Sequence, residues 1–122
     1  MKKLLRSLIS AVMALCLAAC GAAGESTAPA EKKFTVGICQ LAQHTALDAA
    51  TKGFRDALEE ALPGRVVFEE KNASGESVNC ASIINGFVSE KVDLIMANAT
   101  PALTAAASAT SEIPILGTSV TA

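Results

Sequence analysis

The chain has 122 residues, which is enough for about one domain. Hydrophobic residues make up 51% of it and charged residues 18%, and 10 basic residues stand against 12 acidic ones for a net charge of −2 at pH 7. This composition is too apolar for a disordered chain and too poor in basic residues for a nucleic-acid-binding protein.

Residues 1–19 are typical of a secretory signal peptide. Lys2, Lys3 and Arg6 form a charged start, an apolar run covers 8–17, and the small residues Ala18 and Ala19 follow. The apolar run is shorter than the roughly 20 residues that cross a bilayer. Removal of the leader takes away three of the 10 basic residues, so we expect 7 basic and 12 acidic residues and a mature charge of about −5.

The end of this leader, Leu17-Ala18-Ala19-Cys20, resembles a bacterial lipobox. In that motif the chain is cleaved just before the cysteine, whose thiol takes the lipid. An ordinary cleavage site with an incidental cysteine is the alternative. Small and polar residues over 20–33 predict a flexible tether. We therefore expect a fatty-acyl anchor such as palmitate on Cys20, and a location on the extracytoplasmic face of a bacterial cell membrane.

Strand and helix patterns alternate from Phe34 onward. Residues 34–40 form a β-rich run that predicts a first strand. A helix is predicted over 45–62, because apolar residues recur there every three or four positions, and Pro63-Gly64 ends it. Residues 65–71, centred on three consecutive apolar side chains, predict a second strand.

The second half of the pattern repeats this alternation. A helix is predicted over 77–90, with an apolar face that includes Cys80 and Phe87. Residues 93–97 are apolar without alternation, as in strands of parallel sheets. Thr100 is expected to cap a helix that has Pro101 at its first position and ends near residue 110. Residues 113–116 predict a fourth strand.

The order βαβαβαβ predicts an α/β fold of three layers, in which a parallel sheet has helices on both faces and right-handed crossovers. The fourth predicted strand is followed by six residues and no helix, so we expect residues 34–122 to be a truncated α/β lobe. In such a lobe Ile115 and Leu116 lack covering elements, which predicts exposed apolar surface, an open strand edge and marginal stability.

Polar segments follow three of the predicted strands, and ligands of open α/β sheets bind at the carboxyl ends of strands. The segments offer amides, hydroxyls and one imidazole, with no acid, which suits a small polar solute. Main-chain N–H groups near Thr100 and Thr118 are placed to hold a carboxylate. A role as helix cap is the alternative for His44 and Thr100. The candidate ligand-binding residues are Gln40, Gln43, His44, Asn98, Ala99, Thr100, Thr118 and Ser119.

Export and lipidation would leave two thiols, Cys39 and Cys80. Their predicted places, on the first strand and early in the helix over 77–90, keep a disulfide open, with two small buried thiols as the alternative. The sequence has no CxxC motif and no Cys/His cluster, so we expect no metal. It also has no GxGxxG, P-loop or GxSxG motif, so we expect no cofactor and no enzymatic activity.

Three strings of this sequence carry a family resemblance: VGICQLAQHTALDAATKGFRDAL, VDLIMANATPAL and IPILGTSVT. They resemble the N-terminal lobe of substrate-binding lipoproteins of ABC importers, of the kind associated with tryptophan and tyrosine uptake, which have the type 1 periplasmic-binding-protein fold. Thr45 departs from the pattern, in which a proline is expected after the histidine.

The resemblance implies two lobes that close on an amino acid, with contacts from the loops after the first, third and fourth strands. It further implies delivery of the solute to a membrane permease with ATPase subunits, and no chemistry by this chain. Aromatic solutes are suggested by the family alone, because the sequence has no Trp or Tyr to stack on a ring. A membrane-anchored ligand sensor on the same fold is the alternative function.

Overall fold

The computed structural model describes residues 31–121. The predicted leader over 1–19, Cys20 and most of the predicted tether over 20–33 lie outside the described residues, so these assignments stay predictions. Within 31–121, no helix has both the length and the apolar character needed to cross a membrane.

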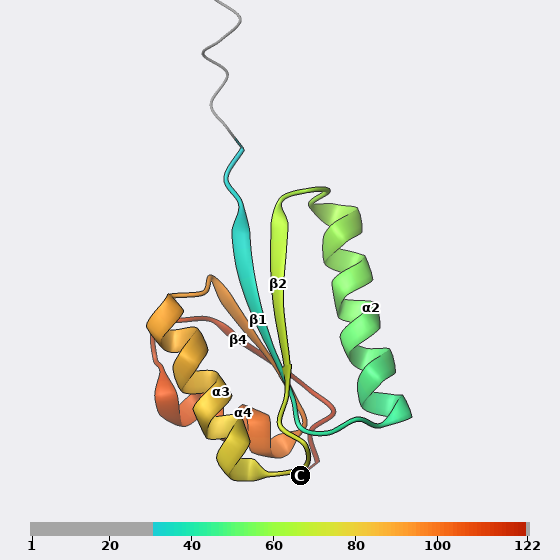
Figure 1. Ribbon diagram of the computed structural model, residues 1–122. Coiled ribbons are helices and arrows are strands. Elements are labelled where there is room, and N and C mark those ends of the chain that lie inside the picture. Colours follow the sequence, from blue (N-terminus) through green and yellow to red (C-terminus); the bar gives the residue numbers. More distant parts are fainter. Residues whose placement is uncertain (1–30, 122) are drawn as a thin grey trace, which may run out of the picture. The chain divides into compact units, whose positions relative to one another are not determined.

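Four parallel strands form one sheet in the order β2-β1-β3-β4 (Figure 1). The strands are β1 (Phe34–Gln40), β2 (Val66–Asn72), β3 (Leu94–Asn98) and β4 (Ile115–Thr118). The helices that connect them are α2 (Thr45–Ala61), α3 (Ser77–Glu90) and α4 (Thr100–Ala109). The predicted α/β fold with a parallel sheet is confirmed.

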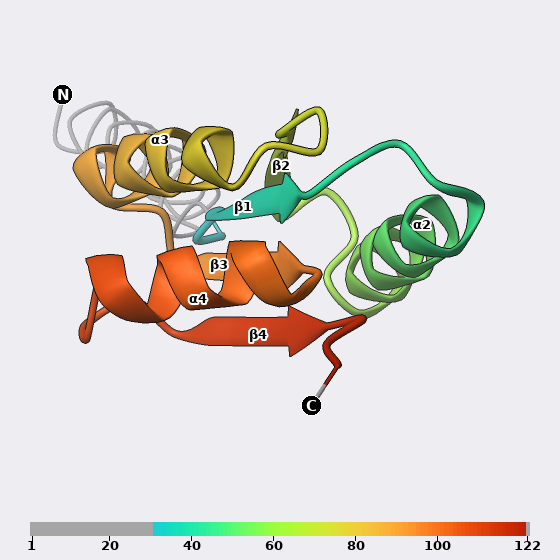
Figure 2. The ribbon, with the colours of Figure 1, turned by 90° about the horizontal axis from the view of Figure 1, so that it is seen from below.

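Helices cover both faces of the sheet, with α2 on one side and α3 and α4 on the other (Figures 1 and 2). The side chains that alternate along the strands divide between two cores. The core under α3 and α4 contains Cys39, Ala73, Cys80, Ile84, Phe87, Val92, Ile95, Ala97, Ala102 and Ala106. The core under α2 is smaller and contains Val36, Ile38 and Met96, with Phe54 and Leu58 of α2 packed on it.

Close packing joins α3 to β1. A Cβ atom built on Gly37 would lie 2.6–2.9 Å from three ring atoms of Phe87. This is shorter than a carbon–carbon van der Waals contact, so the ring occupies the space that any other residue at position 37 would need. The glycine in the first strand therefore sets how closely the helix approaches the sheet.

Several predicted boundaries are wrong by one or two residues. Strands β2 and β3 each begin and end one residue later than predicted, and α2 ends one residue earlier. The N-cap of α4 is Ala99, and Thr100 is already helical. Strand β4 begins at Ile115 rather than at residue 113, because Pro114 has no N–H to donate to the ladder, although its carbonyl accepts from the Ile95 amide at 3.0 Å.

The predicted exposure of the fourth strand is half correct. Leu116 is 45% exposed, as expected. Ile115 instead packs against the core under α3 and α4. The pairing explains this difference, because Ile115 stands opposite Ile95 on the α4 side and Leu116 stands opposite Met96 on the α2 side, where α2 packs on β1, β2 and β3.

Candidate functional site

The predicted binding segments meet at one edge of the sheet. Gln40 at the end of β1 stands opposite Asn98 at the end of β3, and Asn98 stands opposite Thr118 at the end of β4. The loops continue this pairing, since the Leu41 amide donates to the Asn98 carbonyl at 3.2 Å and the Ala99 amide donates to the Thr118 carbonyl at 3.0 Å. The strand-end rim is the name used below for residues 40–44, 98–100 and 118–119.

The centre of the strand-end rim is a topological switch point. After β1 the chain passes into α2 on one face, whereas after the neighbouring β3 it passes into α4 on the other face (Figure 2). The two connections thus diverge between Gln40 and Asn98. Ligands of open α/β sheets bind at such points, outside the carboxyl ends of the strands.

A buried polar network lies directly beneath this point. The Thr51 hydroxyl of α2 donates to Gln40 Oε1 at 2.7 Å and accepts from Asn98 Nδ2 at 2.9 Å. Asn98 Nδ2 also donates to the Leu47 carbonyl at 2.8 Å. Gln40 Nε2 donates to Asp48 Oδ1 at 2.6 Å and to the Ala42 carbonyl at 2.8 Å. These bonds tie the start of α2 to the ends of β1 and β3.

The network gives Gln40 and Asn98 a structural role that the sequence did not indicate. Both residues are buried, and most of their amide capacity is used within the protein. Asn98 Oδ1 is the exception, since no described residue donates to it. We assign both residues to positioning the rim, and direct contact of their side chains with a ligand stays a prediction.

Five of the predicted rim residues reach the surface. They are Gln43, His44, Thr100, Thr118 and Ser119. His44 is the N-cap of α2, and its Nδ1 accepts from the Ala46 amide at 3.2 Å. The capping role considered for His44 is therefore confirmed.

The start of α4 presents main-chain donors to the rim. The first N–H groups of a helix have no intrahelical acceptor, and Pro101 has no N–H, so the amides of Thr100 and Ala102 have no acceptor within α4. Of these two residues, Thr100 is partly exposed and Ala102 is fully buried. The Thr100 hydroxyl accepts from the Thr121 amide at 3.1 Å, which brings the segment after β4 against the same helix start. A helix start with these donors favours an anionic group.

Backbone strain is concentrated at this edge of the sheet. Ala99 has φ 99° and ψ 158°, a region used almost only by glycine, and it is buried. Ser119, after β4, and Ser74, after β2, both have φ 56°. Strain of this kind persists where surrounding contacts fix it, and it collects at ligand sites.

Sequence reasoning missed three parts of the site. An acid, Asp48 in the first turn of α2, lies beside the rim, where its Oδ1 accepts from Gln40 Nε2. Thr51 was also missed. The available signal was its position, because a polar residue within the apolar stripe of α2 is expected to be buried and hydrogen-bonded. The loop after β2 also reaches this edge, since the Gly75 amide donates to the Leu41 carbonyl at 2.7 Å.

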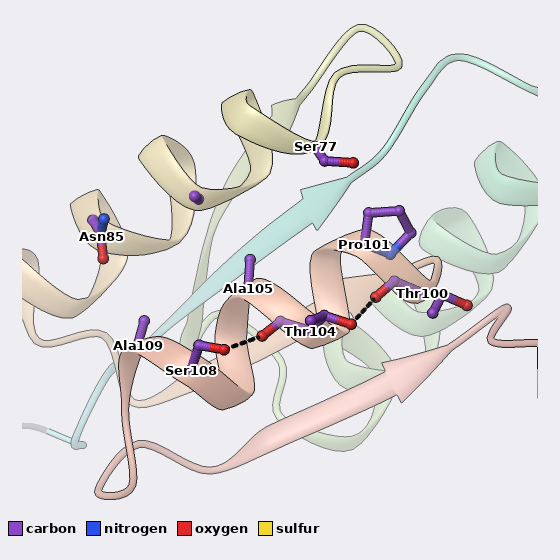
Figure 3. Close-up of a pocket in the computed structure, with 9 residues that line it drawn as sticks. Ser77, Asn85, Thr100, Pro101, Thr104, Ala105, Ser108 and Ala109 are labelled. Atoms are coloured by element: carbon purple, nitrogen blue, oxygen red, sulfur yellow. Dashed lines mark hydrogen bonds between the residues drawn. The ribbon is translucent and has the colours of Figure 1, made fainter.

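A separate groove lies between α3 and α4, on the outer side of the helices (Figure 3). Its volume is about 580 Å³. Thr104 and Ser108 line it, but their hydroxyls donate to the carbonyls of Thr100 and Thr104 within the helix, at 3.0 and 2.9 Å. Thr100 is the one predicted site residue in this groove. The groove is therefore lined mostly by small side chains, two of whose hydroxyls are bonded within α4, and the strand-end rim remains the candidate site.

The chemistry available at the rim is hydrogen bonding. Its surface groups are amides, hydroxyls, one imidazole and main-chain N–H groups. Within residues 31–121, no three His, Cys, Asp or Glu side chains are grouped so that they could hold a metal ion. The arrangement is suited to holding a small polar molecule.

Comparison with known proteins agrees with this description. A family model described as ABC transporter substrate binding protein matches residues 35–122. The chain is 38% identical to a tyrosine-binding protein of Clostridioides difficile over 131 aligned residues, which cover 98% of this chain and 38% of that protein.

Solved structures give the same result. A ligand-free, open substrate-binding protein with adhesive properties from Clostridium difficile has a TM-score of 0.70 and 40% identity, covering 73% of this chain and 31% of that one. An ABC domain from Streptococcus pneumonia, solved in complex with L-Trp, has a TM-score of 0.70 and 29% identity, covering 75% and 32%. The chain thus spans about a third of the length of these relatives.

Proposed function

Since this chain belongs to the ABC transporter substrate-binding protein family, whose members similar to it are binding proteins and not enzymes, we propose that it contributes half of a site that captures an amino acid. An aromatic amino acid is the favoured solute. One relative is a tyrosine-binding protein, and a second was solved with L-Trp. The captured solute would pass to a membrane permease driven by ATPase subunits.

The observation that carries this proposal is the convergence of three strand ends at the switch point between β1 and β3. The start of α4, the partly exposed Thr118 and the exposed Ser119 stand on one side of this point. Gln43 and His44 stand on the other. The donors of α4 suit the carboxylate of an amino acid, because a helix start attracts negative charge. A second set of contacts from another lobe would close over the solute.

A chimera tests this proposal with a complete pocket. The aligned part of the C. difficile tyrosine-binding protein is replaced by this chain, and binding of L-tyrosine and L-tryptophan is measured by calorimetry, with glycine as the control solute. We expect affinity for at least one aromatic amino acid within about tenfold of that of the parent protein. A folded chimera that binds neither would contradict the proposal.

Variants of the chimera locate the contact. Thr118→Ala removes a hydroxyl at the rim, and we expect the affinity to fall roughly tenfold, which is about 1.4 kcal/mol. Thr104→Ala is the matched control, because Thr104 lies one turn along α4 in the separate groove. Equal affinities for both variants would remove Thr118 from the site.

We also propose that the protein is exported and held at the extracytoplasmic face of a cell membrane by a lipid on Cys20. Support comes from the charged start, the apolar run and the Leu17–Cys20 motif. Expression in a bacterium with radiolabelled palmitate is expected to label the full chain and leave Cys20→Ser unlabelled. Equal labelling of both would contradict lipidation at this position.

A further inference from the structure

Two buried thiols lie in the core between β1 and α3. Cys39 and Cys80 are both fully buried and belong to the same core cluster. The structure holds them as free thiols. Neither takes part in the strand-end rim.

The packing of α3 fixes this juxtaposition. Phe87 lies on Gly37, and α3 runs antiparallel to β1, because it connects β2 to β3 and both of these strands are parallel to β1. Moving from Gly37 to Cys39 advances along β1 on the same face. Moving back from Phe87 to Cys80 advances two turns along α3 in the same direction. Both steps bring the thiols together on the α3 side of the sheet.

We propose that Cys39 and Cys80 are the site of a disulfide that fastens the start of α3 to the end of β1. A disulfide requires the two Cβ atoms to lie close together, and the packing of α3 on β1 places both fully buried residues in the same core. The bond would fix the loop over 73–76, whose Gly75 amide already donates to the Leu41 carbonyl at the rim. The site is therefore a covalent support for one side of the binding edge.

The oxidation is a thiol–disulfide exchange with a small disulfide such as oxidised glutathione. The two protein thiols lose their protons and two electrons as the bond between Cys39 and Cys80 forms. The disulfide bond of glutathione breaks, and its two sulfurs take up the electrons and protons as two thiols. Export, as proposed above, would bring the pair to an oxidising compartment, but the test below does not depend on it.

The folded state protects the reduced pair. Burial, and then the charge and the hydrogen bond of the Cys80 thiol, raise the pKa of the Cys39 thiol to about 12. The thiolate is the reacting species, so exchange in the folded protein is slow near neutral pH. We therefore expect the bond to form during folding, before α3 closes over β1.

Refolding of the full chain tests the proposal. Cys16→Ser and Cys20→Ser leave Cys39 and Cys80 as the two thiols. The denatured, reduced chain is refolded in a mixture of reduced and oxidised glutathione, and free thiols are counted under denaturing conditions. We expect no free thiol, a mass lower by two hydrogen atoms, and one peptide that links the two cysteines after digestion.

The oxidised protein is also expected to melt higher by roughly 10 °C, and reductant should abolish the difference. Cys39→Ala and Cys80→Ala are the matched controls, because each leaves a single thiol and should show no effect of reductant. The double alanine variant shows whether the fold forms without either sulfur. A chain that refolds to the native circular dichroism spectrum while keeping two free thiols, or that refolds only when reduced, would overturn the proposal.

Discussion

At the scale of single residues, Thr51 holds together parts of the chain that are far apart in sequence. Its hydroxyl lies between Gln40 of β1 and Asn98 of β3, and it is the buried residue of α2. A helix that otherwise rests on half-buried apolar side chains is thus fixed by a polar contact. This contact aligns the loop from Leu41 to His44 with the strand ends.

Replacement of Thr51 by valine keeps the shape of the side chain and removes the hydroxyl. We expect the free energy of unfolding to fall by about 2 kcal/mol, because Gln40 Oε1 and Asn98 Nδ2 each lose a buried partner. Urea denaturation measures this change. Thr51→Ser keeps the hydroxyl and should cost clearly less than the valine variant. A serine variant as unstable as the valine variant would show that the methyl group matters and the network does not.

Ala99 is a second residue that affects stability by itself, through the strain of its own backbone. Because its φ of 99° lies in a region that suits glycine, Ala99→Gly should raise the free energy of unfolding by about 1 kcal/mol, even after the greater freedom of glycine in the unfolded chain is counted. Ala107→Gly, on the exposed side of α4, should lower it by about 1 kcal/mol. Thermal unfolding of both variants checks this, and two changes of the same sign would contradict the strain at Ala99.

At the scale of elements, α3 lies very close to β1 at Gly37. Among the glycines of the described residues, Gly37 has the closest neighbouring side chain, which is the Phe87 ring. This contact determines the height of α3 above the sheet. The same packing places Cys80 in one core with Cys39, and the loop after β2 reaches the rim. The approach of one helix therefore affects the core and the candidate site together.

Gly37→Ala tests this element contact. The added methyl group would meet the Phe87 ring at 2.6–2.9 Å, so we expect a loss of about 1–3 kcal/mol in the free energy of unfolding. Gly53→Ala is the matched control, because nothing lies within 4 Å of that position in α2, and it should gain about 0.5–1 kcal/mol. Phe87→Leu should partly compensate Gly37→Ala. Additive losses in the double variant would contradict a direct clash.

At the scale of the whole molecule, β4 is an edge strand with an apolar side chain on its uncovered face. Leu116 is 45% exposed, and Val120, just after the strand, is 46% exposed. An open edge with exposed apolar residues favours pairing with another chain. The core on this face, under α2, contains only three of the buried residues of the described chain, so little apolar packing covers the strand edge there.

We therefore expect the chain to self-associate through β4. Leu116→Lys places a charge on this strand and should weaken self-association roughly tenfold, measured by sedimentation velocity over a range of concentrations. Val78→Lys is the control, since Val78 is 76% exposed on α3, away from β4. The same effect from both variants would mean that net charge, rather than the strand edge, controls association.

The sequence predicted most of the fold and the segments that form the rim, but it did not predict every boundary. The bounds of β1 and α3 and the parallel sheet follow from local patterns of apolar residues, and the structure confirms them. The start of α4 was misplaced by one residue, because Thr100 is a good capping residue and only the path of the chain reveals that Ala99 occupies that place. The rim segments were found because parallel strands end at the same edge.

What the sequence determined by itself was the order of strands and helices, because the periodicity of apolar side chains depends only on neighbours along the chain. Only the tertiary structure decided which polar residues stay at the surface. Gln40 and Asn98 are the last residues of their strands, just as Thr118 is, yet α2 closes over the first two and bonds to them. Burial and hydrogen bonding depend on residues that are far apart in sequence. Such residues come into contact only when the helices pack on the sheet.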